Sequence, residues 1–152
     1  MYRIALAVTT FIAGTAVGLL AQGRLRHVNP PALSTPTGYT HIVQPPKDSS
    51  IVFIAGQVSA DKSGAVVGKG DFRAQSKQVF DNLKAAVEAA GGTMNDIAKI
   101  NVYATDLSQI AALREVRQQY FKKNPPASTL IQVVSLARPE YMLEIEAIAF
   151  VK

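Results

Sequence analysis

The segment that most constrains the fold is the last apolar stretch of the chain, residues 141–150, which reads Tyr-Met-Leu-Glu-Ile-Glu-Ala-Ile-Ala-Phe. From residue 143 to residue 147, apolar and acidic residues alternate with the period of two that is typical of a β-strand, and the rest of the stretch is apolar. Glu144 and Glu146 would then point to one face of a sheet, while the apolar residues between them point to the other. If the apolar face packs on helices, the acidic face must contact water, a ligand or a partner subunit.

Strand and helix patterns alternate through the preceding part of the chain. Strands are predicted at residues 41–44, 51–58, 97–105, 125–134 and 141–150, and amphipathic helices at residues 72–90 and 109–123. This order predicts an α/β (α+β) single domain in which one mixed sheet carries both helices on one face. The other face is too apolar to remain in water, so we expect an oligomer.

The first two strands are predicted to form an antiparallel hairpin, because turn residues 45–50 separate them. Nearly every residue from 51 to 55 is apolar, so the second strand is expected to be central and covered on both faces. Gly56 then marks a bulge or a close approach of the backbone to another group.

The two helices have recognisable ends and faces. Asp71 is predicted to cap the first helix, and Gly91 with Gly92 to end it. In the second helix the predicted inner stripe is Ile110, Leu113, Val116 and Tyr120, with Arg114, Arg117 and Gln118 off it.

The chain begins with an apolar segment that carries no charge from residue 4 to residue 21. Its length lies between the core of a signal peptide and a membrane-spanning helix. The predicted organisation is a signal peptide or membrane anchor at 1–23, a Pro-rich linker or arm at 24–37, and a domain at 38–152. We therefore expect a bacterial protein that is exported, periplasmic or membrane-anchored rather than cytoplasmic, and whose N-terminal segment engages the membrane or the export machinery.

Composition excludes several classes of site. The formal net charge is +5, without a run of five basic residues or a basic groove with interleaved aromatic residues, so no nucleic-acid partner is expected. The absence of cysteine excludes disulfides, thiolate metal sites and cysteine nucleophiles. No cluster of His, Asp and Glu has metal-ligand spacing, so neither a metal nor another cofactor is expected.

The C-terminal pattern, Pro126-Ala127-x-Thr129-x-Ile131-x-Val133 followed by Leu-Glu-Ile-Glu-Ala at residues 143–147, resembles the signature of the RidA/YjgF family, the imine and enamine deaminases. Gly38-Tyr39 and Phe-Ile-Ala-Gly-Gln at residues 53–57 extend the resemblance over essentially the whole domain. The resemblance implies a chorismate-mutase-like fold and a homotrimer with three pockets between subunits. It also implies hydrolysis of reactive imines to keto compounds and ammonia.

The resemblance also implies roles for particular residues. It makes Glu144 the catalytic group that helps to place the attacking water. The substrate-binding residues that it implies are Tyr39, Ala55, Gly56, Arg114, Ser128 and Leu130. Several of these depart from the family: Ala55 stands where a serine is common, Leu130 where a small residue is common, and Arg114 where an asparagine can line the pocket.

The most important departure is Ser128, which stands where the family has the arginine that binds the substrate carboxylate. Loss of this bidentate, charge-assisted contact would weaken carboxylate binding about a hundredfold. In one interpretation the protein is a deaminase of shifted specificity, either with Arg114 restoring the charge or with a substrate that has no carboxylate. In the other it is a non-catalytic trimeric module that binds a small metabolite or acts as a chaperone.

Overall fold

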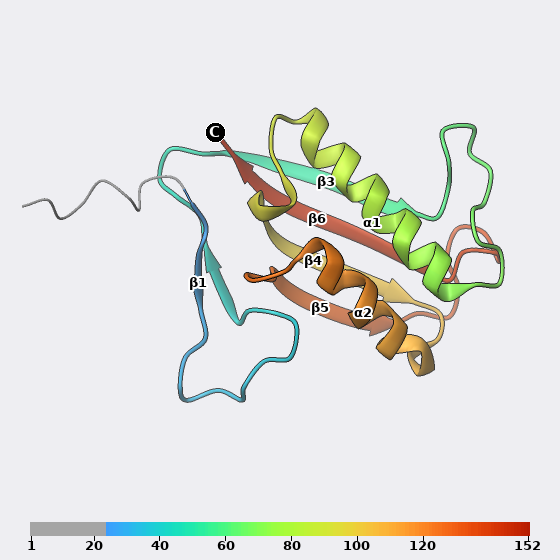
Figure 1. Cartoon of the computed structure of the whole chain (residues 1–152), viewed down its shortest axis with the longest axis horizontal. Helices are drawn as coiled ribbons and strands as arrows, with labels where there is room; N and C mark the ends of the chain where they lie inside the picture. The colour runs from blue at the N-terminus through green and yellow to red at the C-terminus, as the bar shows by residue number, and fades with distance from the viewer. Residues whose placement is uncertain (1–23) are drawn as a thin grey trace, which may run out of the picture.

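The computed structural model describes residues 24–152 and shows a sheet with two helices on one face (Figure 1). The predicted signal peptide or anchor lies outside the described residues. Within residues 24–152, no helix has both the length and the apolar character needed to cross a membrane.

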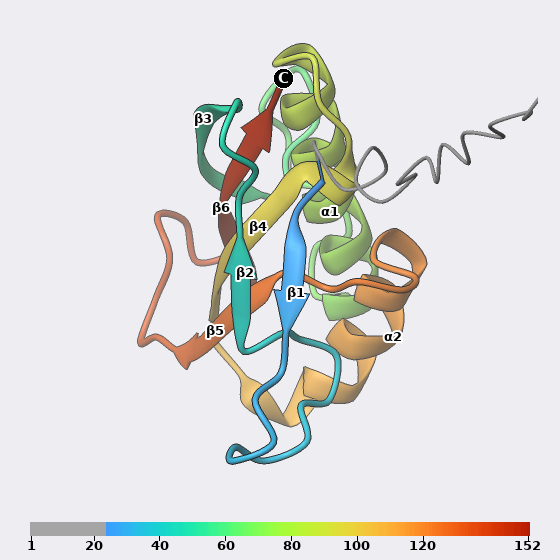
Figure 2. The ribbon, with the colours of Figure 1, turned by 90° about the vertical axis from the view of Figure 1, so that its left-hand side faces the viewer.

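The elements follow the predicted order after one additional N-terminal strand. They are β1 (Arg26–Val28), β2 (Ile42–Gln44), β3 (Ser50–Val58), α1 (Phe72–Ala89), η1 (Met94–Asp96), β4 (Ile97–Ala104), η2 (Leu107–Gln109), α2 (Ile110–Tyr120), β5 (Ala127–Gln132) and β6 (Leu143–Val151). The main sheet has the order β3-β6-β4-β5, in which β6 is antiparallel to both neighbours and β4 is parallel to β5. Figure 2 shows both helices on the same side of this sheet. The predicted mixed sheet with two helices on one face is thus confirmed.

Helix α1 has the ends that the sequence predicts. The Asp71 side chain accepts a hydrogen bond from the backbone N–H of Ala74, which satisfies one of the free donors of the first turn. After the helix, Gly91 has a φ of 84°, a left-handed conformation that glycine adopts without steric cost.

The core lies between the helices and the inner face of the sheet. Along β6, Leu143, Ile145 and Ala147 are buried, whereas Glu144 and Glu146 are only partly buried on the outer face. Helix residues Val79, Phe80, Leu83 and Val87 are fully buried against this inner face. The alternation of apolar and acidic residues in the sequence therefore correctly predicted which face of β6 packs against the core.

Two pairing predictions are wrong. Strand β2 does not form a hairpin with β3 but pairs antiparallel with β1, which lies in the segment expected to be a linker or arm. Strand β3 is not central: among the described strands it pairs with β6 alone, at the edge of the main sheet. Its outer face is uncovered in the single chain, with Ile51 57% exposed and Phe53 77% exposed.

Candidate functional site

A hollow of about 340 Å³ lies on the helix side of the sheet edge, where α2, β5 and the segment before β2 meet. Four of the predicted binding residues line it, namely Tyr39, Arg114, Ser128 and Leu130. Ser128 and Leu130 pair with Ile100 and Val102 of β4, whose side chains face the core. No aspartate or glutamate is among the residues that line this hollow.

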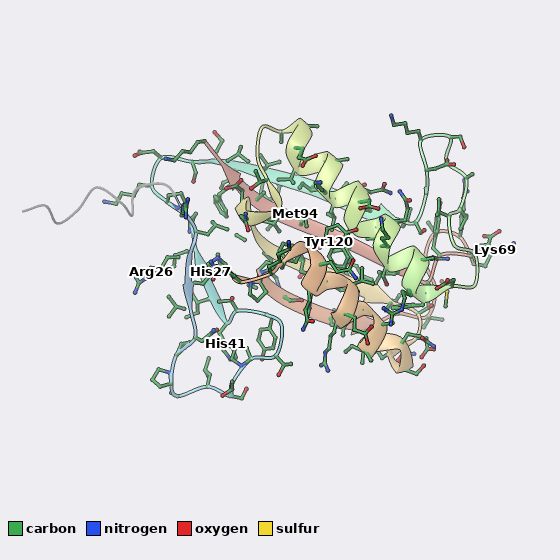
Figure 3. All side chains as sticks on the ribbon, viewed as in Figure 1. Arg26, His27, His41, Lys69, Met94 and Tyr120 are labelled. Atoms are coloured by element: carbon green, nitrogen blue, oxygen red, sulfur yellow. The ribbon has the colours of Figure 1, made fainter. Side chains whose placement is uncertain are left out.

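The segment that carries Tyr39 is held against the start of β5 by Thr40. The backbone N–H of Thr40 donates to the carbonyl of Pro126 at 3.1 Å, and its hydroxyl donates to the carbonyl of Pro125 at 2.6 Å. His27 and His41 belong to this N-terminal region around β1 and β2 (Figure 3). The His41 ring meets the Tyr39 ring edge-on at 5.2 Å. These contacts fix one wall of the hollow.

Arg117 also lines the hollow, and its position corrects the prediction that it lies off the inner stripe of α2. It is 9% exposed, yet its guanidinium forms no hydrogen bond or ion pair with any residue of the described part of the chain. No fully buried side-chain nitrogen or oxygen in that part lacks a hydrogen-bond partner, so the Arg117 nitrogens must be in contact with open space. Burial, and then the positive charge of Arg114, lower the pKa of Arg117.

Gly38 makes room for the Arg117 guanidinium. A Cβ at this position would lie 2.5 Å from Nη2 of Arg117, which is too close for any side chain without movement. Gly38 also has a φ of 75°, in the region that favours glycine. A glycine at position 38 therefore suits both this backbone conformation and the observed position of the Arg117 guanidinium.

The other polar side chains discussed for this hollow also lack hydrogen-bond or ion-pair partners within residues 24–152. The Tyr39 and Ser128 hydroxyls form no hydrogen bond with residues 24–152, and Arg114 forms no ion pair with them. Guanidinium and hydroxyl groups can all donate to an anionic ligand. The hollow is therefore a cationic, donor-rich site suited to a small anion.

Glu144 and Gly56 meet on the opposite, outer side of the sheet. The pairing of β3 with β6 shifts register between Ile54 and Gln57, which confirms the predicted irregularity at Gly56. A Cβ on Gly56 would lie 1.9 Å from Oε1 of Glu144, so only glycine leaves this carboxylate in place. Glu144 forms no hydrogen bond or ion pair with another described residue.

Glu146, two residues along the same face, is engaged. Its Oε1 accepts hydrogen bonds from Asn101 Nδ2 at 2.7 Å and from the Tyr103 hydroxyl at 3.0 Å. The hydrogen bond to Glu146 raises the pKa of Tyr103. Ala55 lines a separate hollow of about 350 Å³ beside Glu146, Asn101 and other residues of this outer face.

The predicted site residues therefore fall into two groups in one chain. Tyr39, Arg114, Ser128 and Leu130 share the hollow on the helix side, while Glu144, Gly56 and Ala55 lie on the outer side. The sheet separates them, so a single subunit cannot bring both groups to one small molecule. Among residues 24–152, no group of three or more His, Cys, Asp or Glu is placed to hold a metal ion.

Sequence reasoning missed Arg117, although its spacing contained a signal. Arg117 follows Leu113 by four residues, and residues four apart lie on the same face of a helix. A buried stripe drawn through Leu113 includes Arg117, but an arginine is seldom buried without a partner. Because Arg117 is charged, it was predicted to lie on the exposed face of the helix, although its spacing from Leu113 indicated the buried face.

Comparisons with known proteins agree with this architecture. The family model described as Endoribonuclease L-PSP matches residues 30–151. A RutC family protein of Pyrococcus horikoshii is 39% identical over 104 residues, which cover 68% of this chain and 82% of that protein.

Solved structures of the family superpose over most of the chain. The Rid family protein YyfB of Yersinia pestis is 34% identical with a TM-score of 0.76, covering 83% of this chain and 98% of its own. RidA of an Antarctic Psychrobacter species is 40% identical with a TM-score of 0.62, covering 66% of this chain and 80% of its own. The chorismate-mutase-like fold that the resemblance implied is confirmed, and the chain belongs to the RidA/YjgF family.

Proposed function

We propose that the protein hydrolyses reactive 2-imino and enamine acids to 2-oxo acids and ammonia, with a binding pattern altered at Ser128. The observation that carries this proposal is that Arg117, a largely buried residue with no hydrogen bond or ion pair to residues 24–152, lines the hollow that contains Ser128. It supplies positive charge near the strand position that has lost its arginine. A planar guanidinium can hold both oxygens of a carboxylate at once.

In the proposed reaction, a water molecule adds to the imine carbon while Glu144 accepts one of its protons. The carbon–nitrogen double bond becomes a single bond, and Glu144 returns the proton to the nitrogen. The product of this step is a tetrahedral carbinolamine. The hydroxyl proton then passes to the nitrogen as the carbon–nitrogen bond breaks, so that ammonia leaves and the carbonyl of the 2-oxo acid forms. Glu144 suits this role because its carboxylate forms no hydrogen bond or ion pair within the described chain, so it can bind a water.

The two groups of site residues require a second subunit in this reaction. Glu144 faces the outer side of the sheet, whereas Arg117 and Ser128 face the hollow on the helix side. We propose that the site forms in a homotrimer, where the outer face of one subunit meets the edge of another. The uncovered apolar residues of β3 support this, because a face of this kind is normally buried against a partner.

The proposed activity is tested by supplying the purified protein with an imine made in situ by an amino acid oxidase. Semicarbazide traps the imine that remains, so an active protein lowers the rate of semicarbazone formation relative to the oxidase alone. Equal rates with and without the protein would contradict the proposal. Ligand binding without turnover would instead favour the non-catalytic binding module.

The proposed trimer predicts that Phe53→Asp breaks the assembly. This change places a charge on the uncovered apolar face, where a partner subunit would have to desolvate it. Light scattering after gel filtration should give three chain masses for the wild type and one for the variant. The matched control is Ala85→Asp on the exposed side of α1, which should remain trimeric. A monomeric wild type would contradict the shared site.

A further inference from the structure

Two arginines share the hollow, although one would suffice for a single carboxylate. Arg114 and Arg117 are three residues apart on α2, which places them on adjoining positions of the same helix face. Two like charges so placed repel each other, and the repulsion grows when one of them is buried. The residues that line the hollow therefore bring together positive charge that an anionic ligand would neutralise.

The nearest acidic residues along the chain do not supply that neutralising charge. Glu115, between the two arginines in sequence, points away and pairs with Arg73 of α1 at 2.6 Å. Asp106, before η2, accepts hydrogen bonds from the backbone N–H and hydroxyl of Ser108. No acidic residue lines the hollow itself.

We propose that this hollow binds a small dianion, so that the preferred substrates are the imines of amino dicarboxylic acids; this inference rests on the proposed function. Each carboxylate would accept two parallel hydrogen bonds from one guanidinium. The hydroxyls of Tyr39 and Ser128 remain available for the group between the carboxylates.

The size and walls of the hollow agree with such a ligand. Its volume of about 340 Å³ is at the small end of ligand sites in proteins. Val102, Leu113 and Leu130 form an apolar wall, which suits the methylene groups of a short dicarboxylate. The ligand would then place its carboxylates against the two arginines and its methylene groups against this apolar wall.

The test compares two stable product analogues that differ in one carboxylate. Isothermal titration of the protein with 2-oxoglutarate and with 2-oxopentanoate, which has the same number of carbons, gives the two dissociation constants. We expect 2-oxoglutarate to bind at least about tenfold more tightly, the effect of one additional charge-assisted contact. Equal affinities would overturn the proposal.

Variants separate the two arginines. Arg114 is exposed, so Arg114→Gln should leave the fold intact and reduce the preference for 2-oxoglutarate to about twofold or less. Arg117→Gln should weaken the binding of both analogues. Lys84→Gln, which removes an exposed positive charge on α1, is the matched control and should change neither affinity. An unchanged preference in Arg114→Gln would overturn the assignment of the second carboxylate.

The outcomes also distinguish this inference from the proposed function. Preferential binding of 2-oxoglutarate without imine hydrolysis would support the dianion site and contradict the proposed activity. Imine hydrolysis with equal affinity for the two analogues would support the proposed activity and contradict the dianion site. Inorganic phosphate is the second probe: if it competes with 2-oxoglutarate at equal affinity, the substrate class would be phosphorylated rather than dicarboxylic, which would overturn the proposal.

Discussion

Replacing Glu144 by glutamine is expected to slow imine hydrolysis at least about a hundredfold, because a positioned general base contributes roughly 10²–10⁴ to a rate. The amide has nearly the same shape as the carboxylate but cannot accept the proton of the attacking water. The contact with Gly56 is preserved, so stability should hardly change. The measurement is the turnover number at saturating imine, together with the thermal unfolding of both proteins.

Glu146→Gln is the matched control for this prediction. It lies two residues away on the same strand and face, but its carboxylate is occupied by Asn101 and Tyr103. We expect its turnover number to stay within about threefold of the wild type, since the amide oxygen can still accept these hydrogen bonds. Equal losses in the two variants, or full activity of Glu144→Gln, would refute the assignment of Glu144.

Replacing Phe80 by alanine is expected to lower the free energy of unfolding by about 3–5 kcal/mol, the range found when a buried aromatic residue is truncated. Phe80 is fully buried, stacks on Tyr120 with ring centroids 5.1 Å apart, and meets Phe121 edge-on at 6.1 Å. The cavity would open where α1, α2 and the sheet meet. A loss of this size is a large fraction of the roughly 5–15 kcal/mol that stabilises a domain.

Thermal unfolding followed by circular dichroism should detect the Phe80→Ala change as a fall in Tm of about 10 °C for a chain of this size. Leu33→Ala provides the control, because Leu33 is 52% exposed and its truncation should cost less than about 0.5 kcal/mol. Similar values of Tm for the two variants would mean that Phe80 is not a central contact of the core.

Local patterns in the sequence predicted the helices and strands, whereas the pairing of the strands depends on contacts between residues far apart in the chain. The period of two in β6 and the cap at Asp71 act within a few residues, and both predictions are confirmed. The partner of β3 is β6, at the far end of the chain, and no local signal specifies it. Residues 51–55 were correctly predicted to present apolar side chains on both faces of the strand. Within a single chain, however, only one of these faces is covered.

The candidate site was predictable to a similar extent. Four of the residues taken from the family resemblance lie in one hollow, because residues of α2, β5 and the preceding segment converge there. Arg117 was missed because an unpaired charge in an apolar stripe contradicts the ordinary cost of burial. Such a conflict between a local rule and the structure is expected where a ligand supplies the missing partner.

The placement of the two groups on opposite faces of the sheet has an evolutionary consequence. The carboxylate that would act as the base toward water lies on the outer face of β6, whereas the cations that would select the substrate lie on α2. In the proposed shared site, a mutation that changes one wall would then leave the other wall undisturbed. A guanidinium could move from strand to helix and change the ligand selectivity, while the proposed role of Glu144 is kept.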